Sequence, residues 1–222
     1  MNLIKQGDFF DPRMLKSQRV HIIGCGSVGS CIAELLTRFG VDRFVLYDFD
    51  YVEEKNLVNQ MFNRGDIGYM KVDAVADLMK SINPDVQFET VSAGWTGQKL
   101  DGYVFLAVDS VELRKKICEA NKMNQNVKAM FDFRTRLTDA QHYAAKWNDY
   151  KSVKGFMSQM NFTDNEAKAA TPTSACGITL GVAPTVRLVV NAGVCNFINF
   201  VKGEPLKKMI LVDAFKFQTV AV

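Results

Sequence analysis

The 222-residue sequence lacks a Cys-x-x-Cys pair, a long apolar run and a strong excess of charge of either sign. Its five scattered cysteines argue against a structural zinc site and favour reduced thiols in a cytoplasm. No uninterrupted apolar run approaches the roughly 20 residues that a membrane-spanning helix needs, and the first residues lack the apolar stretch of a signal peptide. The formal charge of +3 is too small to indicate binding to nucleic acid or to a membrane.

Short apolar runs alternate with segments of helical period in the first part of the chain. Buried strands are predicted over 19–23, 43–47, 103–108 and 127–133, and a half-buried strand over 86–91. Helices are predicted over 30–39, 70–82 and 111–123. Two strands joined through a helix run parallel. The pattern therefore predicts an α/β fold with a Rossmann-like, doubly wound and mostly parallel sheet.

The alternation breaks after Arg134. Residues 140–147 are expected to form an antiparallel strand, and the polar stretch 151–173 is expected to include a mobile loop. An apolar run predicts a long helix over 178–201, and strands at 208–213 and 215–220 would close the sheet. The second part of the chain is thus predicted to add antiparallel strands to the parallel sheet.

A glycine-rich turn joins the first predicted strand to the first predicted helix. Its pattern is Gly24-x-Gly26-x-x-Gly29, and Asp48 follows the next strand. The first glycine permits a tight turn, the second lets backbone approach a phosphate, and the third lets helix pack on strand. The helix N-terminus offers N–H groups to an anion, and Asp48 suits ribose hydroxyls. The pattern indicates a nucleotide site; the alternative is that the glycines serve packing alone.

Several uncommon identities follow at fixed spacing after the second strand. They are Asp48-x-Asp50-x-Val52, then Asn56-Leu57, then Asn59-Gln60, then Gly68-x-x-Lys71-Val72. In these residues the chain resembles the ubiquitin-activating, ThiF and MoeB family of carboxylate-adenylating enzymes. The resemblance covers roughly residues 13–134 well and the C-terminal part loosely. It implies ATP and Mg²⁺ as cofactors and an acyl-adenylate as product.

The resemblance also implies a role for each matching position. The matched residues are Gly24, Gly26 and Gly29 for the phosphates, Asp48 for the ribose, Asn56 and Lys71 for the triphosphate, and Asp109 for magnesium, with Asp50 as a further candidate. A lysine ammonium neutralises charge at the α-phosphate, and Mg²⁺ prefers carboxylate oxygens. Simpler alternatives are a solvated Lys71, an Asn56 or Asp109 that only caps a helix, and an exposed loop acid at Asp50.

The chain departs from the family at Asn59, where the family has an arginine that contacts the triphosphate. Losing a guanidinium removes a charge-assisted phosphate contact. Arg64, in the same loop, is the preferred substitute, and a solvent-facing loop residue is the alternative for it. Arg19, or Arg13 acting across a dimer, are the other candidates.

Cys176 stands after the polar stretch and before the long apolar helix. In some members of the family a cysteine receives the activated carboxylate, and a helix N-terminus would favour its thiolate. The alternative for Cys176 is packing at a tight junction.

The function predicted in this way is ATP-dependent adenylation of the C-terminal carboxylate of a small ubiquitin-like protein or peptide. The alternatives are a nucleotide-binding partner module with weakened activity, to which Asn59 would point, and an NAD-dependent oxidoreductase. We expect one ThiF-type domain over 1–222, with a nucleotide-binding half at 1–135. Residues 136–222 would supply a crossover loop, the long helix and the closing strands. The resemblance further implies a homodimer.

Overall fold

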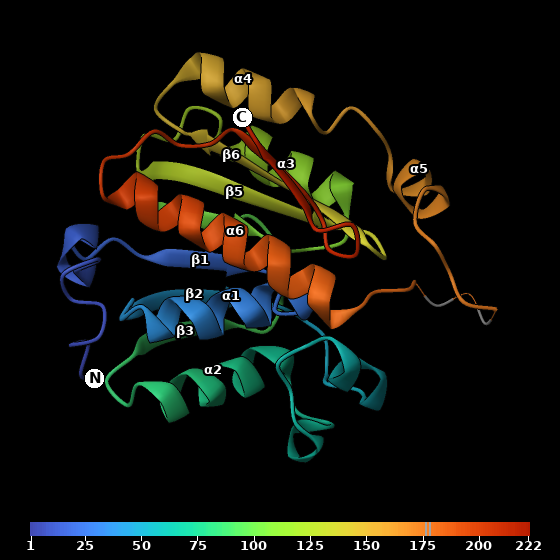
Figure 1. Cartoon of the computed structure of the whole chain (residues 1–222), viewed down its shortest axis with the longest axis horizontal. Helices are drawn as coiled ribbons and strands as arrows, with labels where there is room; N and C mark the ends of the chain where they lie inside the picture. The colour runs from blue at the N-terminus through green and yellow to red at the C-terminus, as the bar shows by residue number, and fades with distance from the viewer. Residues whose placement is uncertain (176, 178) are drawn as a thin grey trace.

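The chain folds around one sheet, which has eight strands in the part that the computed structural model describes, residues 1–175, 177 and 179–222 (Figure 1). Their order is β3-β2-β1-β4-β5-β6-β7-β8. The strands β1 to β5 run parallel, and β6, β7 and β8 add on as antiparallel strands. The bounds are β1 Val20–Ile23, β2 Arg43–Tyr47, β3 Gln87–Val91, β4 Gly102–Leu106, β5 Val127–Thr135, β6 Asp139–Lys146, β7 Met209–Asp213 and β8 Gln218–Ala221. The predicted fold class is confirmed.

Helices cover both faces of this sheet (Figure 1). One face carries α1 (Ser27–Arg38), α2 (Lys71–Ile82) and α6 (Ala183–Val201). The other carries α3 (Val111–Asn121) and α4 (Tyr150–Ser158), and the short α5 (Asp164–Ala169) follows α4. Three 3-10 turns complete the described elements: η1 Pro12–Leu15, η2 Glu54–Val58 and η3 Arg64–Asp66. None of the helices in the described residues is long and apolar enough to cross a bilayer.

The helix α1 shows how local sequence sets this packing. Val28, Ile32 and Leu36 recur at helical spacing and are all buried against the sheet. Gly40 follows the helix with a φ of +85°, a left-handed conformation that suits glycine and ends the helix. The strand β2 begins a few residues later, so α1 is the helix that connects the parallel strands β1 and β2.

The polar stretch 151–173, which we expected to include a mobile loop, contains most of α4 and all of α5, and residues 159–163 and 170–173 of it lie outside these helices. Asp149 caps α4 by accepting a hydrogen bond from Lys151 N at 3.0 Å. Phe156 of α4 is buried, with its ring edge-on to Trp147 at 5.9 Å between centroids. A capping box between Thr163 and Glu166 begins α5. The few apolar residues of this stretch are enough to pack α4 against the sheet, because Phe156 contacts Trp147, the residue that follows β6.

The long apolar helix also begins later than predicted. It runs over Ala183–Val201, with Pro184 in its first turn, whereas the apolar run suggested a start at residue 178. Proline is favoured in a first turn because its missing N–H has no partner there in any helix. Residues 179–182 precede the helix and belong to the connection from α5.

Candidate functional site

The glycine turn links β1 to α1 at the carboxyl edge of the sheet. Gly24 has a φ of +96°, and a Cβ there would lie 2.7 Å from backbone atoms of Ala107. A Cβ on Gly29 would lie 1.8 Å from the Gly24 carbonyl oxygen, so α1 packs directly on the turn. Both positions therefore exclude a side chain. The space beside Gly26 is different, because no described atom lies within 4 Å of where its Cβ would be.

The helix α1 begins at this open space. Gly26 is its N-cap, and among the described residues no side chain caps the helix. A helix start without a side-chain cap leaves N–H groups available to a bound anion. The turn thus combines a close backbone junction at Gly24 and Gly29 with room for a phosphate at Gly26.

Asp48 ties the glycine turn to the loop that follows β2. Its Oδ2 accepts a hydrogen bond from Cys25 N at 2.6 Å, and its Oδ1 accepts one from Asp50 N at 2.9 Å. Burial raises the pKa of Asp48, while the hydrogen bonds from Asp50 and Cys25 and the charge of Lys71 act in the opposite direction. The carboxylate is held beside the turn, where a ribose bound with its phosphates at Gly26 would be.

Lys71 begins α2 and forms an ion pair with Asp50. The distance from Nζ to Asp50 Oδ2 is 2.8 Å, and the side chains are 9% and 52% exposed respectively. A second contact, from Lys71 N to the Asp50 carbonyl, measures 2.9 Å. The interpretation of Lys71 as a solvated surface residue is therefore wrong. A buried ammonium whose carboxylate partner is half in water is well suited to exchange that partner for a phosphate.

The polar residues of the loop between Asp50 and Lys71 differ in burial and in hydrogen-bond partners. Asn56 is buried and caps η2 through its Oδ1, which accepts from Glu53 N at 2.9 Å. Asn59 donates from Nδ2 to the Gly181 carbonyl at 3.3 Å, so it tethers the segment before α6. Arg64 is 82% exposed and pairs with Glu54 at 3.4 Å. Within the described residues Arg64 does not contact Asp50 or Lys71.

Gln60 is a residue whose environment the sequence did not reveal. Its Oε1 is buried and has no hydrogen-bond partner in residues 1–175, 177 and 179–222. A buried oxygen without a partner costs free energy unless a ligand or water supplies a donor. The only sequence signal was its place directly after Asn59 in the family motif.

Asp109 lies in the turn between β4 and α3, with its side chain exposed. Ser110 provides the cap of α3, because its Oγ accepts from Leu113 N at 3.1 Å, and this leaves the Asp109 carboxylate available. The same turn packs on the glycine turn: Ala107 N donates to the Ile23 carbonyl at 2.8 Å, and Ala107 blocks a side chain at Gly24. Asp109 is thus two residues from Ala107, which contacts the backbone of the glycine turn.

The remaining candidates lie elsewhere or outside the described residues. Arg19 pairs with Asp101, just before β4, with Nε 3.0 Å from Oδ1, so it lies at the amino edge of the sheet. Arg13 is 90% exposed and pairs with its neighbour Asp11. Cys176 lies outside the described residues, so the prediction of a thioester there stays a prediction.

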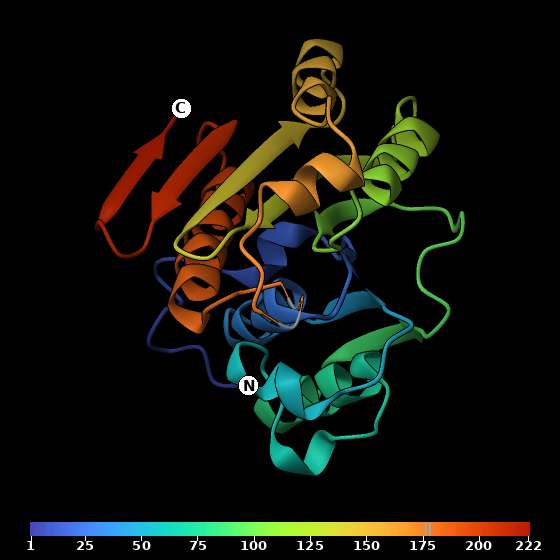
Figure 2. The same cartoon turned by 90° about the vertical axis from the view of Figure 1, so that its right-hand side faces the viewer.

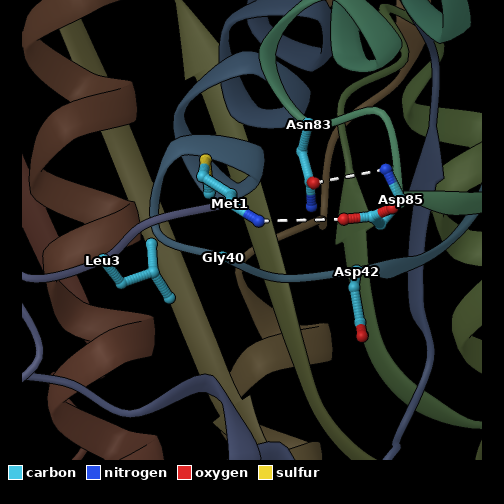
Figure 3. Close-up of a pocket in the computed structure, with 6 residues that line it drawn as sticks. All are labelled: Met1, Leu3, Gly40, Asp42, Asn83 and Asp85. Carbon is cyan, nitrogen blue, oxygen red and sulfur yellow. Dashed lines mark hydrogen bonds and ion pairs between the residues drawn. The ribbon is translucent and has the colours of Figure 1, made fainter.

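When the molecule is viewed toward the carboxyl ends of the parallel strands, the described residues between α5 and α6 pass in front of the blue β1–α1 unit (Figure 2). The bond between Asn59 and the Gly181 carbonyl shows that the end of this segment contacts the loop after β2. A pocket of about 220 Å³ lies instead at the amino ends of β2 and β3, where the amine of Met1 is 3.8 Å from Asp85 (Figure 3). That pocket carries none of the motif residues.

The arrangement fits a nucleoside triphosphate with a divalent cation. The open space at Gly26 and the N-terminus of α1 suit phosphate oxygens. The buried Lys71 supplies a positive charge, and the exposed carboxylates of Asp50 and Asp109 are the oxygen donors that Mg²⁺ prefers. These groups come from three connections, β1–α1, β2–α2 and β4–α3, which the fold gathers at one edge of the sheet.

Comparison with known proteins agrees with this geometry. The model of the ThiF family matches residues 8–220. Ubiquitin-like modifier-activating enzyme 5 of Drosophila virilis is 33% identical over 146 residues, which cover 56% of this chain and 35% of that protein. The chain therefore spans about a third of the length of this relative.

Two solved structures share the fold. The structure of PaaA has a TM-score of 0.73 at 17% identity and covers 95% of this chain and 65% of that one. The structure of Escherichia coli MccB with ATP has a TM-score of 0.68 at 16% identity, with the same shares covered. At sequence identities this low, the similarity to both structures shows a shared fold only.

Proposed function

The chain belongs to the ThiF family, and from that premise we propose that it adenylates the C-terminal carboxylate of a small ubiquitin-like protein or peptide with ATP and Mg²⁺. The observation that carries the proposal is the gathering of the Gly26 turn, the Lys71–Asp50 pair and the Asp109 turn at one edge of the sheet. Family membership favours ATP over NAD as the nucleotide.

Each group has a distinct part in the proposed reaction. The backbone at Gly24 and Gly26 and the start of α1 hold the phosphates, and Asp48 holds the ribose. An oxygen of the substrate carboxylate attacks the α-phosphorus, the bond from that phosphorus to the bridging oxygen breaks, and pyrophosphate leaves. Lys71 exchanges Asp50 for the phosphates and neutralises the charge that develops there. Asp109, with Asp50 beside it, would hold the magnesium ion, which neutralises phosphate charge when bound.

The loop after β2 holds the chain's main departure from the family. Asn59 cannot supply the charge of an arginine, and Asn56 uses its oxygen as a cap. We propose Arg64 as the second cation on the triphosphate. Its exposed pair with Glu54 at 3.4 Å is weak enough to be given up for a phosphate. This role requires the side chain to turn away from Glu54 when ATP binds.

The proposed substrate and assembly rest on the relatives. The name of the Drosophila virilis relative, a ubiquitin-like modifier-activating enzyme, supports a ubiquitin-like partner. Because this chain spans about a third of that relative, the partner stays a proposal. A homodimer is proposed on the same ground, with the exposed Arg13 as the residue offered to a second copy.

Exchange of labelled pyrophosphate into ATP tests the proposal. We expect exchange when the protein is given candidate small proteins or peptides with free C-terminal carboxylates. The matched control is the same peptide with a C-terminal amide, which removes the nucleophile and should abolish exchange. Exchange that is equal with acid and amide would refute adenylation of that carboxylate.

A nucleotide-binding module with weakened activity is the second candidate. Asn59 at the family's arginine position and the exposed Arg64 favour it. It predicts ATP binding, measured by calorimetry, without exchange for any substrate of the panel. The two candidates therefore differ in exchange and agree in binding.

A further inference from the structure

The turn that carries Asp109 is held by side chains from both of its sides. It is a short link between β4, which ends at Leu106, and α3, which begins at Val111. An exposed carboxylate in a short turn binds a cation at defined geometry only if the surrounding backbone is fixed. The residues that flank Asp109, Val108 and Ser110, are both bonded to charged side chains.

Arg114 holds the inner side of the turn. It is buried in α3, and its guanidinium donates to the Val108 carbonyl, to the Asp132 carboxylate and, at 2.9 Å, to the Phe133 carbonyl. Asp132 is fully buried and also accepts from Arg134 Nε at 2.7 Å. The Arg114 guanidinium therefore joins the turn after β4 to the neighbouring strand β5.

The charge of Arg114 is retained in this environment. Burial, and next the charge of Arg134, lower the pKa of Arg114, the carboxylates of Asp109 and Asp164 act in the opposite direction, and the resulting pKa is about 9. A guanidinium with that pKa is protonated at neutral pH.

Asp164 holds the outer side of the turn. It is the first residue of α5, and its Oδ2 accepts from Ser110 Oγ at 2.9 Å. Its Oδ1 accepts from Val111 N at 2.5 Å and from Glu112 N at 3.3 Å. One carboxylate of the segment between α4 and α6 thus satisfies the first N–H groups of α3, directly beside Asp109.

We propose that Arg114 and Asp164 are positioning residues that hold the Asp109 turn from opposite sides, so that docking of α5 sets how well Asp109 binds magnesium. The inference rests on the proposed function, because it assigns the metal to Asp109. Loss of either residue would let the turn move while the glycine turn and Lys71 keep their places. The expected defect is therefore in the metal-dependent part of ATP binding.

A purely structural role for Asp164 predicts a different result. Asp149 offers the matched control, because it is also an aspartate that caps a helix, accepting from Lys151 N at 3.0 Å, but it does not contact the Asp109 turn. Asp164→Ala and Asp149→Ala should lower the melting temperature by similar small amounts. Only Asp164→Ala should alter the response to magnesium.

The test is calorimetric titration of the full chain with ATP, first in EDTA and then at increasing Mg²⁺. We expect Asp164→Ala to keep the wild-type affinity in EDTA and to need about tenfold more Mg²⁺ for the half-maximal gain in affinity, the lower range for losing a residue that orients a metal ligand. Arg114→Lys should show the same shift, because lysine keeps the charge but cannot reach three acceptors.

The outcomes separate this inference from the proposed function. If wild type gains affinity with Mg²⁺ and Asp164→Ala gains it at the same concentrations, the positioning role is overturned and the proposed function stands. An equal shift in Asp149→Ala would overturn it as well. If the wild type binds no ATP under either condition, the proposed function fails and this inference fails with it. Asp164 is only partly buried, so its variant keeps the test available should Arg114→Lys not fold.

Discussion

Replacing Lys71 with methionine should slow exchange strongly while leaving the fold almost as stable as before. Methionine keeps an unbranched apolar side chain in the first turn of α2 and removes only the ammonium. The partner left behind is Asp50, whose side chain is 52% exposed and can be hydrated. Because one member of the pair is already half in water, the lost ion pair is expected to cost no more than about 1 kcal/mol of unfolding free energy.

The expected effect on the rate is much larger. A preorganised donor that acts on charge in the transition state contributes about 2.7–4 kcal/mol, or roughly 10²–10³ in kcat. Lys71 is 9% exposed on its side chain, so water cannot readily replace its charge at the phosphates. Exchange by Lys71→Met should therefore fall by about 10²–10³ at saturating ATP.

Removing the charge of Asp50 instead should affect stability more than removing that of Lys71. Asp50→Asn leaves the buried Lys71 ammonium without its carboxylate, and an unsatisfied buried group costs about 1–3 kcal/mol, more when it is charged. We expect Asp50→Asn to destabilise the protein more than Lys71→Met does. This order follows from the unequal exposure of the two side chains and not from the ion pair as such.

Urea unfolding and pyrophosphate exchange measure the two quantities on the same preparations. Lys80→Met is the control, because Lys80 is an exposed lysine on the same helix, over the Phe88 ring at 5.1 Å. It should keep wild-type exchange. Retention of exchange within about threefold by Lys71→Met would refute the assignment of Lys71 to the phosphates. A loss of more than about 2 kcal/mol in stability would refute the argument from exposure.

Three further predictions concern the glycine turn, a buried histidine and the altered arginine position. Gly29→Ala should lower the unfolding free energy by about 3 kcal/mol or more, since its Cβ would lie 1.8 Å from the Gly24 carbonyl oxygen. Gly26→Ala should unfold in urea as the wild type does, but it should bind ATP more weakly because its Cβ enters the open space beside the turn. Burial lowers the pKa of His142 to about 3, so below a pH of about 6.5 the unfolded chain binds a proton that the folded protein does not. The unfolding free energy should therefore drop by up to about 1.4 kcal/mol per pH unit between about pH 6.5 and pH 3. A His142→Gln variant whose unfolding free energy falls with pH as steeply as that of the wild type would contradict this. Asn59→Arg should tighten ATP binding about tenfold in calorimetry by restoring a charge-assisted phosphate contact, with Asn59→Ala as the control for the lost bond to Gly181; no gain over Asn59→Ala would place the family's arginine function elsewhere.

Features that depend on neighbours in the chain could be predicted from the sequence. The β2 strand was expected at 43–47 and is observed over Arg43–Tyr47, because its run of apolar residues is buried on both faces of a parallel sheet. The turn at Gly24 was expected from its glycine spacing, and its φ of +96° is one that glycine tolerates. Asp48 was expected at the end of β2 beside that turn, and its bond to Cys25 N spans 2.6 Å.

Only the tertiary structure decided which polar residues share an environment. Asp164 bonds to Ser110, which lies 54 positions earlier in the chain, and no local pattern couples residues at that separation. The burial of Lys71, the exposure of Arg64 and the docking of α4 on Trp147 likewise depend on how distant elements pack. The spacing of residues along the chain determines turns and the buried faces of helices, because these involve only a few neighbouring residues. Contacts between a turn at the edge of the sheet and a segment far away in the chain form only when the whole core has assembled.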